Sequence, residues 1–409
     1  MIAFQHALQL TLENIQPLSA ELIPISLAAG RVASENLFAR INLPTVDVSL
    51  KDGYALRSSD VDSATPQSPI TLKVIGDVAA GGRWQGVVEP GTAVRILSGA
   101  PIPEGAEAVV SEEFTLREGE NLIVMADAHP GRNILHKGRD IHSGQVLVTS
   151  GEVLKPAQVG LLAAGGHNRI AVRKLPRVGI IATGDEVIAP GKPLEEGKLY
   201  ASNLVTLASW CRYYGMQVDT WVVKDQLDAL RSQIKLSIID HDLLLTSGGA
   251  WKGDRDLVVS LLDDLGWDKY FHRVRIGPGK AVGFGLFDGK PVFCLPGGPP
   301  SNYMAFLNLA LPGLFKLSGR QHTGLSTIPA RLGQDVRGQK DWTQFIQGTL
   351  KDSAGKLIFH PLKLESRLQM MAKVDGFLTI PEGQDHINAG EIIKVKLLTP
   401  LIDGGILTE

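Results

Sequence analysis

The stretch "VGIIATGDEVIAPG", residues 178–191, joins an apolar run to a glycine turn that carries two acidic residues. The apolar run, Val178 to Ile181, is typical of a strand that is buried on both faces. The turn that follows contains Asp185 and Glu186. In open α/β sheets, ligands bind at the carboxyl ends of the strands. The stretch therefore predicts a buried strand that ends in a ligand site.

The sequence around this stretch alternates between strand and helix patterns. Helices are expected in "SNLVTLASWCRYYG" (202–215, with Gly215 as its C-cap), in 225–238 starting at Asp225, at roughly 254–265 and at about 300–317. Strands are expected in "RVGIIAT" (177–183), "MQVDTWVV" (216–223), "HDLLLTSGG" (241–249), "AVGFGLF" (281–287) and "KPVFCLPGG" (290–298). This alternation predicts a mostly parallel α/β sheet with covering helices in residues 174–322.

The flanking segments have a different pattern. Residues 3–15 have apolar residues near helical spacing, and residues 45–140 contain short β runs separated by glycine and proline, which predicts a β-rich lobe. Residues 141–173 form an apolar return segment, and we expect them to join residues 1–44 in one discontinuous N-terminal domain. Residues 323–409 return to β runs and predict a small, barrel-like C-terminal β domain. The expected fold class is therefore multi-domain α/β plus β.

Composition excludes several classes of protein. The chain has 409 residues, 44% of them hydrophobic and 21% charged, with a formal net charge of −2, so no basic field indicates nucleic acid or a membrane surface. The N-terminus lacks a secretory signal pattern, and the apolar stretch 305–315 is too short to span a bilayer. Cys211 and Cys294 are expected to be reduced core thiols. We expect a cytoplasmic protein.

Three strand ends carry glycine in the predicted α/β domain. They are Thr183-Gly184-Asp185-Glu186, Thr246-Ser247-Gly248-Gly249 and the loop from Leu295 through Pro296, Gly297, Gly298, Pro299 and Pro300 to Ser301. Successive glycine amides can bind an anion such as a phosphate. Carboxylates beside an anion then require a counter-ion, and Mg²⁺ takes one or two carboxylates plus phosphate oxygens. The acids concerned are Asp185, Glu186, Asp254 and Asp256, and the predicted metal ligands among them are Asp185, Glu186 and Asp256.

Most of these acids also have a structural interpretation. Asp185 could hydrogen-bond its own turn, and Asp254 and Asp256 could open a helix, where acids interact favourably with the dipole. Asp225 could be an N-cap. The Gly298-Pro299-Pro300 segment could simply start a helix. None of the glycine patterns matches a P-loop or a dinucleotide-binding fingerprint.

Seven motifs together resemble one family. They are "SLKDGYAL", "RILSGAPIPEGAEAVV", "GRNILHKGRDI", "VGIIATGDEV", "LLLTSGGAWKGDRD", "GPGKAVGFG" and "LPGGPPSN", in this order over residues 49–302. The chain resembles the molybdopterin molybdotransferase family, which includes the E domain of gephyrin. The resemblance implies insertion of molybdate, or a related oxyanion such as tungstate, into adenylylated molybdopterin with release of AMP and help from Mg²⁺ or a similar ion. It also implies an elongated homodimer with sites shared between subunits, and molybdoenzymes or other cofactor-pathway proteins as candidate partners.

The resemblance also assigns residues. It gives catalytic roles to Asp52 in "KDGYA", Glu186, Asp256 and Lys280, the second lysine of the family's "KPGKP" motif. The substrate-binding candidates are Ser98, Asp140, Asp225, Pro296 and Pro299 from matched motifs, together with the strand-end residues Thr183, Gly184, Ser247, Gly248, Gly249 and Gly297.

This chain departs from the family pattern at several positions. The first lysine of "KPGKP" is Gly277, the usual threonine is Ser98, and Lys51 and Arg139 replace a methionine and a glutamate. Trp251 and Lys252 stand where small residues are usual, and Met370 where serine is frequent.

Two functions remain open at this stage. One is the transferase, which the retained acids favour because clustered carboxylates repel each other without a metal. The other is a non-catalytic carrier or scaffold that binds a pterin cofactor, which the replacement at Gly277 favours.

Overall fold

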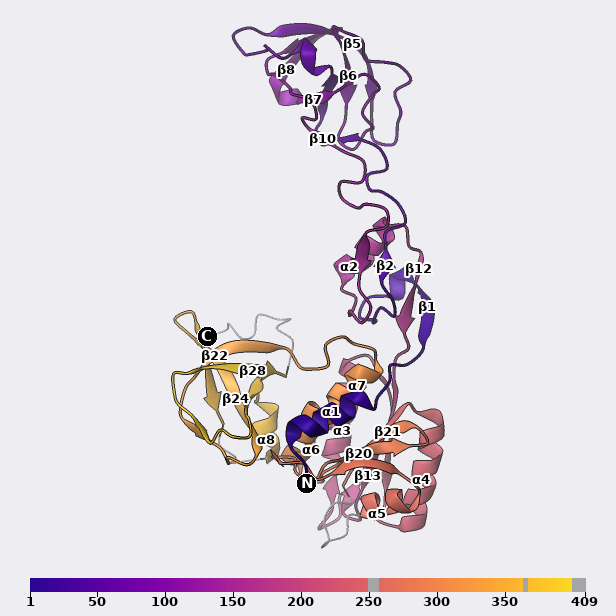
Figure 1. The fold of residues 1–409 in the computed structure, drawn as a ribbon, viewed down its shortest axis with the longest axis vertical. Helices are drawn as coiled ribbons and strands as arrows, with labels where there is room; N and C mark the ends of the chain where they lie inside the picture. Colours follow the sequence, from indigo (N-terminus) through magenta and orange to yellow (C-terminus); the bar gives the residue numbers. More distant parts are fainter. Residues whose placement is uncertain (249–256, 363–366, 399–409) are drawn as a thin grey trace.

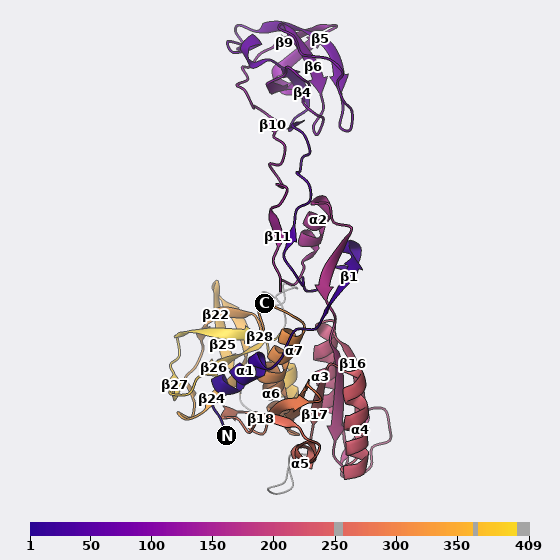
Figure 2. The ribbon, with the colours of Figure 1, turned by 45° about the vertical axis from the view of Figure 1, so that its right-hand side comes forward.

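The computed structural model describes residues 1–248, 257–362 and 367–398 of an elongated molecule (Figures 1 and 2). The β-rich lobe lies at one end, and a slender central part joins it to the α/β and C-terminal parts at the other end. Of the helices in the described ranges, none is long and apolar enough to cross a lipid bilayer.

The α/β part contains a six-stranded sheet in the order β16-β13-β17-β21-β20-β18. The strands are β13 (Arg177–Thr183), β16 (Gln217–Val223), β17 (Leu243–Ser247), β18 (Asp268–His272), β20 (Gly283–Phe287) and β21 (Lys290–Leu295). The first four strands in this order are parallel. β20 runs antiparallel to both of its neighbours, β21 and β18. The predicted mostly parallel sheet is therefore confirmed.

Helices cover both faces of this sheet because alternate residues of each strand point to opposite sides. Val178 and Ile180 pack with α3 (Ser202–Tyr213) and with the long helix formed by α6 (Pro299–Ala305), a π-helical turn (Phe306–Ala310) and α7 (Leu311–Leu317). Ile181 packs on the other face with α4 (Leu227–Asp240) and α5 (Leu257–Asp264). Gly215 follows α3 with φ of +78°, the left-handed conformation expected of a glycine at a helix C-terminus.

The β-rich lobe is built on a sheet in the order β7-β4-β6-β5-β9-β8. Its strands are β4 (Gly53–Leu56), β5 (Ile70–Val78), β6 (Thr92–Ile96), β7 (Ala108–Ser111), β8 (Thr115–Glu118) and β9 (Asn121–Val124). The predicted β runs of this segment are thus strands, with one hydrophobic cluster around Leu72 and another around Ile96. The short strands β3 (Val48–Ser49) and β10 (Ile134–Leu135) pair at its base.

The central part brings together segments that lie far apart in the sequence. β1 (Ala20–Pro24) pairs with β12 (Arg169–Arg173), and β2 (Leu37–Phe38) pairs with β11 (Val146–Val148). The helix α2 (Pro156–Ala164) covers this core through the fully buried Leu162.

The N-terminal helix α1 (Phe4–Glu13) forms as predicted, but it does not pack with this central part. Its residues Phe4 and Ala7 belong to the core of the α/β part, and the Phe4 ring lies 5.4 Å from that of Phe345 in the C-terminal part. The expectation that all of residues 1–44 belong with residues 141–173 is therefore wrong for α1. An amphipathic pattern shows that a helix has an apolar face but does not show which neighbour covers it.

The C-terminal part is a closed five-stranded sheet, which confirms the predicted barrel-like domain. Its strands are β22 (Thr327–Leu332), β24 (Thr343–Ser353), β25 (Lys356–Pro361), β26 (Gly376–Ile380) and β28 (Ile392–Leu397), and β24 closes the ring by pairing with β26. The short strands β19 (Ile276–Gly277), β23 (Val336–Arg337) and β27 (His386–Ile387) and the helix α8 (Arg367–Ala372) complete it.

Candidate ligand site

Three glycine-bearing strand ends meet at one edge of the α/β sheet, as predicted. β13 ends at Thr183, β17 at Ser247 and β21 at Leu295, and these strands are parallel neighbours. The chain runs from β13 to β16 on one side and then returns to β17 on the other side. The gap between β13 and β17 is therefore the topological switch point, where open α/β sheets bind ligands.

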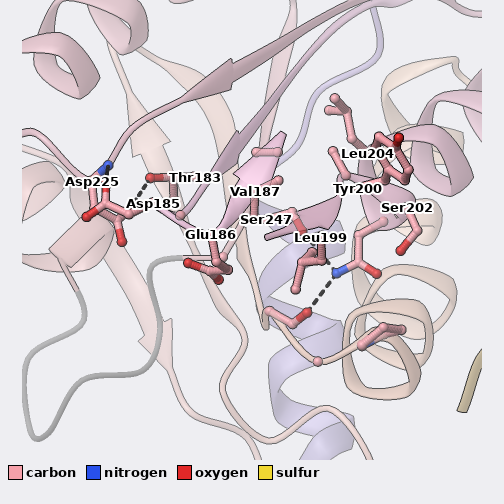
Figure 3. Close-up of a pocket in the computed structure, with 18 of the residues that line it drawn as sticks. Thr183, Asp185, Glu186, Val187, Leu199, Tyr200, Ser202, Leu204, Asp225 and Ser247 are labelled. Atoms are coloured by element: carbon pink, nitrogen blue, oxygen red, sulfur yellow. Dashed lines mark hydrogen bonds between the residues drawn. The ribbon is translucent and has the colours of Figure 1, made fainter. Parts of the chain in front are cut away.

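A cavity of about 660 Å³ lies at this edge (Figure 3). Its lining includes the predicted residues Thr183, Gly184, Asp185, Glu186, Asp225, Ser247, Gly248, Gly297 and Pro299. The short strands β14 (Val187–Ile188) and β15 (Leu199–Tyr200) form another wall. Nine candidates from four separate segments thus share one cavity. The predicted Gly249, Asp254 and Asp256, together with Trp251 and Lys252, lie outside the described residues.

Glycine is required where the loops approach most closely. Gly248 has φ of +104°, and a Cβ atom at this position would lie 2.1 Å from the carbonyl oxygen of Thr183. A Cβ on Gly297 would lie 3.6 Å from the Cα of Gly248. The loops after β17 and β21 are therefore within contact distance of each other. The glycines allow three loops to converge around one ligand.

Asp225, which follows β16, is joined to the end of β13 by two hydrogen bonds. The Thr183 hydroxyl donates to Asp225 Oδ1 over 2.5 Å, and the backbone N–H of Asp225 donates to Asp185 Oδ1 over 3.2 Å (Figure 3). α4 begins at Leu227, and the residue at its N-cap is Gln226. Asp225 is therefore not the N-cap. Asp185 accepts a hydrogen bond from the backbone N–H of Asp225, which lies in a different turn.

The carboxylates of Asp185 and Glu186 are exposed on one turn at the cavity. Asp185 uses Oδ1 for the Asp225 N–H, which leaves Oδ2 available. Two carboxylates fit the small number of protein ligands that Mg²⁺ takes when phosphate oxygens and waters complete its shell. Among the described residues, no group of three or more His, Cys, Asp or Glu side chains could hold a metal by itself.

The sequence predictions missed four polar residues at this site. Asn203 and Asn302 donate to loop carbonyls, Lys198 Nζ donates to the Asp185 carbonyl over 2.9 Å, and Tyr200 lies in the wall. Asn302 stands at the end of the motif "LPGGPPSN", so its position beside a glycine loop could have identified it. Asn203 stands at the start of α3, and only the tertiary fold brings it to the glycine loop.

Other predicted residues lie away from the cavity within one chain. Asp52 and Ser98 are together in the lobe, where the Ser98 N–H donates to Asp52 Oδ1 over 2.7 Å, and Asp140 lies exposed below the lobe. Figure 1 shows the lobe at the opposite end of the molecule from the sheet edge. Lys280 is likewise not among the described lining residues: its ammonium lies 5.5 Å from the ring centre of Trp342. Pro296 lies beside the cavity without lining it.

The fold and the cavity define an elongated, multi-domain α/β protein with a ligand site at the switch point of its parallel sheet. The chain is 33% identical over 383 residues to "Molybdopterin molybdenumtransferase 2" of Mycobacterium tuberculosis, covering 92% of this chain and 95% of the relative. This chain belongs to the molybdopterin molybdenumtransferase family, also called the MoeA family.

Further comparisons cover nearly the whole chain. Family profiles match residues 2–166 ("MoeA N-terminal region (domain I and II)"), 179–316 ("Probable molybdopterin binding domain") and 329–398 ("MoeA C-terminal region (domain IV)"). The "Molybdopterin molybdenumtransferase" of Staphylococcus aureus is 28% identical over 97% of this chain and 95% of its own length. The crystal structure of the molybdopterin biosynthesis MoeA protein from Pyrococcus horikoshii has a TM-score of 0.83 and 32% identity, and covers 98% of this chain and 100% of its own.

Proposed function

We propose that this protein inserts molybdate into adenylylated molybdopterin, with release of AMP, in the biosynthesis of the molybdenum cofactor. The observation that carries the proposal is the cavity at the switch point, where acidic residues and glycine loops converge. The "Probable molybdopterin binding domain" profile covers this part of the chain, and the curated relatives are named as molybdopterin molybdenumtransferases.

Each part of the cavity has a role in this proposal. Ser247 and the backbone at Gly297 bind phosphate oxygens, because hydroxyl and N–H groups donate to anions. The Gly248 N–H instead donates to the Leu295 carbonyl over 3.4 Å. Asp185 and Glu186 hold Mg²⁺, which when bound neutralises charge on the phosphate groups. The bond between Thr183 and Asp225 holds the ends of β13 and β16 together. Lys280 is proposed to contact the oxyanion, and Asp256 to complete the metal site.

We also propose a homodimer in which the lobe of one subunit completes the cavity of the other. Asp52, Ser98 and Asp140 match site motifs but lie far from the cavity in their own chain (Figure 1). The central part exposes several large apolar side chains, including Leu22 and Leu27 at 57% and 66%. We propose that these side chains contribute to the dimer contact, since contiguous apolar surface is what marks protein–protein interfaces.

A mixing experiment tests the shared site. Asp52→Ala and Glu186→Ala are each expected to inactivate the protein. Exchanging subunits between the two inactive variants should restore partial activity, because one site of each mixed dimer then has both residues. Absence of any rescue, with subunit exchange verified by two different affinity tags, argues against a shared site.

A second function is kept because of one specific observation. The family's first "KPGKP" lysine is Gly277 here, and Lys280 contacts Trp342, so neither position brings a cation into the described cavity lining. A non-catalytic carrier that binds the pterin cofactor needs no such cation. We propose a cytoplasmic location for either function, a reducing compartment in which the buried Cys211 and Cys294 stay as thiols.

A further inference from the structure

Two asparagines that no sequence motif assigned bind the same pair of loops at the cavity. Asn302, in the first turn of α6, donates through Nδ2 to the Pro296 carbonyl and to Ser247 Oγ, both over 2.9 Å. Asn203, at the start of α3, donates through Nδ2 to the Gly297 carbonyl over 2.8 Å and to Ser247 Oγ over 3.4 Å. A carbonyl oxygen can only accept, so these contacts fix which end of each amide is the nitrogen.

The asparagines determine what the Ser247 hydroxyl can do. A hydroxyl has one hydrogen and two lone pairs, and here both asparagines direct N–H groups at its oxygen. The hydrogen is therefore left to donate, and within the described ranges no acceptor takes it. Because Ser247 is buried at the strand end and lines the cavity, the partner that suits it is a ligand oxygen that only accepts.

The same asparagines hold the third loop. Gly297 and Gly298 both line the cavity, and glycine has more conformational freedom than any other residue. Hydrogen bonds to the carbonyls of Pro296 and Gly297 fix two successive peptide groups of this loop. Asn302 is only 2% exposed and is not part of the lining, so it acts on the cavity through these neighbours.

We propose that Asn203 and Asn302 are positioning residues for a phosphate group of the ligand. They orient the Ser247 hydroxyl as a hydrogen-bond donor toward a phosphate oxygen and hold the Pro296–Gly298 loop in its binding conformation. A phosphate oxygen is a charged acceptor, and hydrogen bonds to charged acceptors are the stronger ones. This inference rests on the proposed function, because molybdopterin carries the phosphate.

The test measures the dissociation constant of molybdopterin by equilibrium titration of the full-length protein. Asn302→Asp keeps the side-chain shape but replaces the donor with an acceptor, which takes up the Ser247 hydrogen. Loss of one hydrogen bond to a charged group should weaken binding roughly tenfold to a hundredfold. Asn203→Ala should have a smaller effect through Ser247, since that contact is the longer one at 3.4 Å.

Asn308→Asp is the matched control. Asn308 is also 2% exposed and lies further along the same helix, where it donates to the Met304 carbonyl over 3.0 Å. Its Oδ1 accepts from Lys396 Nζ over 3.0 Å, so a new carboxylate there would gain an ion pair. This variant should bind molybdopterin as the unmodified protein does.

A double variant separates positioning from a general loss of structure. If Asn302 acts mainly through the hydroxyl, adding Asn302→Asp to Ser247→Ala should cause little further loss, because coupled residues are not additive. Two results overturn this inference and leave the proposed function standing. One is a double variant whose loss of binding free energy equals the sum of the losses in the two single variants. The other is an Asn302→Asp protein with unchanged affinity. Failure of the unmodified protein to bind molybdopterin overturns both.

Discussion

Replacing Gly248 with alanine tests whether the close approach of two strand ends builds the cavity. The added Cβ would lie 2.1 Å from the Thr183 carbonyl oxygen, and the φ of +104° is one that side chains with a Cβ rarely adopt. Backbone strain of this kind costs about 1–3 kcal/mol, and the loop must also move by roughly an ångström to relieve the contact. A displacement of that size at a reacting site can lower the rate by about a hundredfold.

The assay combines thermal unfolding with AMP release from adenylylated molybdopterin. Each kcal/mol should lower Tm by roughly 2–4 °C for a unit the size of the α/β part. Gly324→Ala is the control, because Gly324 does not line the cavity, is not left-handed and has no atom within 4 Å of an added Cβ. Normal stability and full activity in Gly248→Ala would refute the reasoning, as would equal damage in the control.

Four further predictions concern charges. Glu186→Gln keeps the shape of the side chain but removes its charge, so it should abolish turnover with an unchanged Tm; full activity would remove Glu186 from the metal site. Lys280→Ala should raise the molybdate concentration for half-maximal AMP release roughly tenfold to a hundredfold. Gly277→Lys should lower that concentration, because it restores the lysine that the family has at this position. The fold has room for it, since an added Cβ meets only Gln344 side-chain atoms at 3.8 Å. If neither variant changes the molybdate concentration, this oxyanion site is wrong. Burial lowers the pKa of Lys396 below its ordinary value. The unfolded chain therefore keeps this proton to higher pH than the folded protein does. The free energy of unfolding should rise as pH rises from the folded pKa toward about 10.4. In urea unfolding, the free energy of unfolding of the unmodified protein should rise with pH relative to that of Lys396→Met. A difference between the two proteins that stays constant with pH contradicts this prediction.

Local patterns predicted most of the sheet and the meeting of the strand ends. The apolar run at Val178 indicated a buried strand, and the rule for parallel sheets placed Thr183, Ser247 and Gly297 at one edge. These predictions succeeded because they depend on burial and on strand direction. Both are readable from a few neighbouring residues.

Contacts between distant segments could not be predicted in the same way. Asp225 has the residue type and position of an N-cap, but its carboxylate accepts from Thr183, which lies 42 residues away in the sequence. Lys280 was expected at the site because it matches the second lysine of the family's "KPGKP" motif, yet its ammonium contacts Trp342 of the C-terminal part. In both cases the side chain interacts with a partner that only the tertiary fold brings near.

The central claim is tested most directly by measuring AMP release from adenylylated molybdopterin with purified protein, with and without molybdate. The account predicts release that depends on molybdate and is lost in Glu186→Gln, with formation of molybdenum cofactor in step with AMP. Tight binding of molybdopterin without any molybdate-dependent release of AMP would contradict the transferase function and favour the carrier.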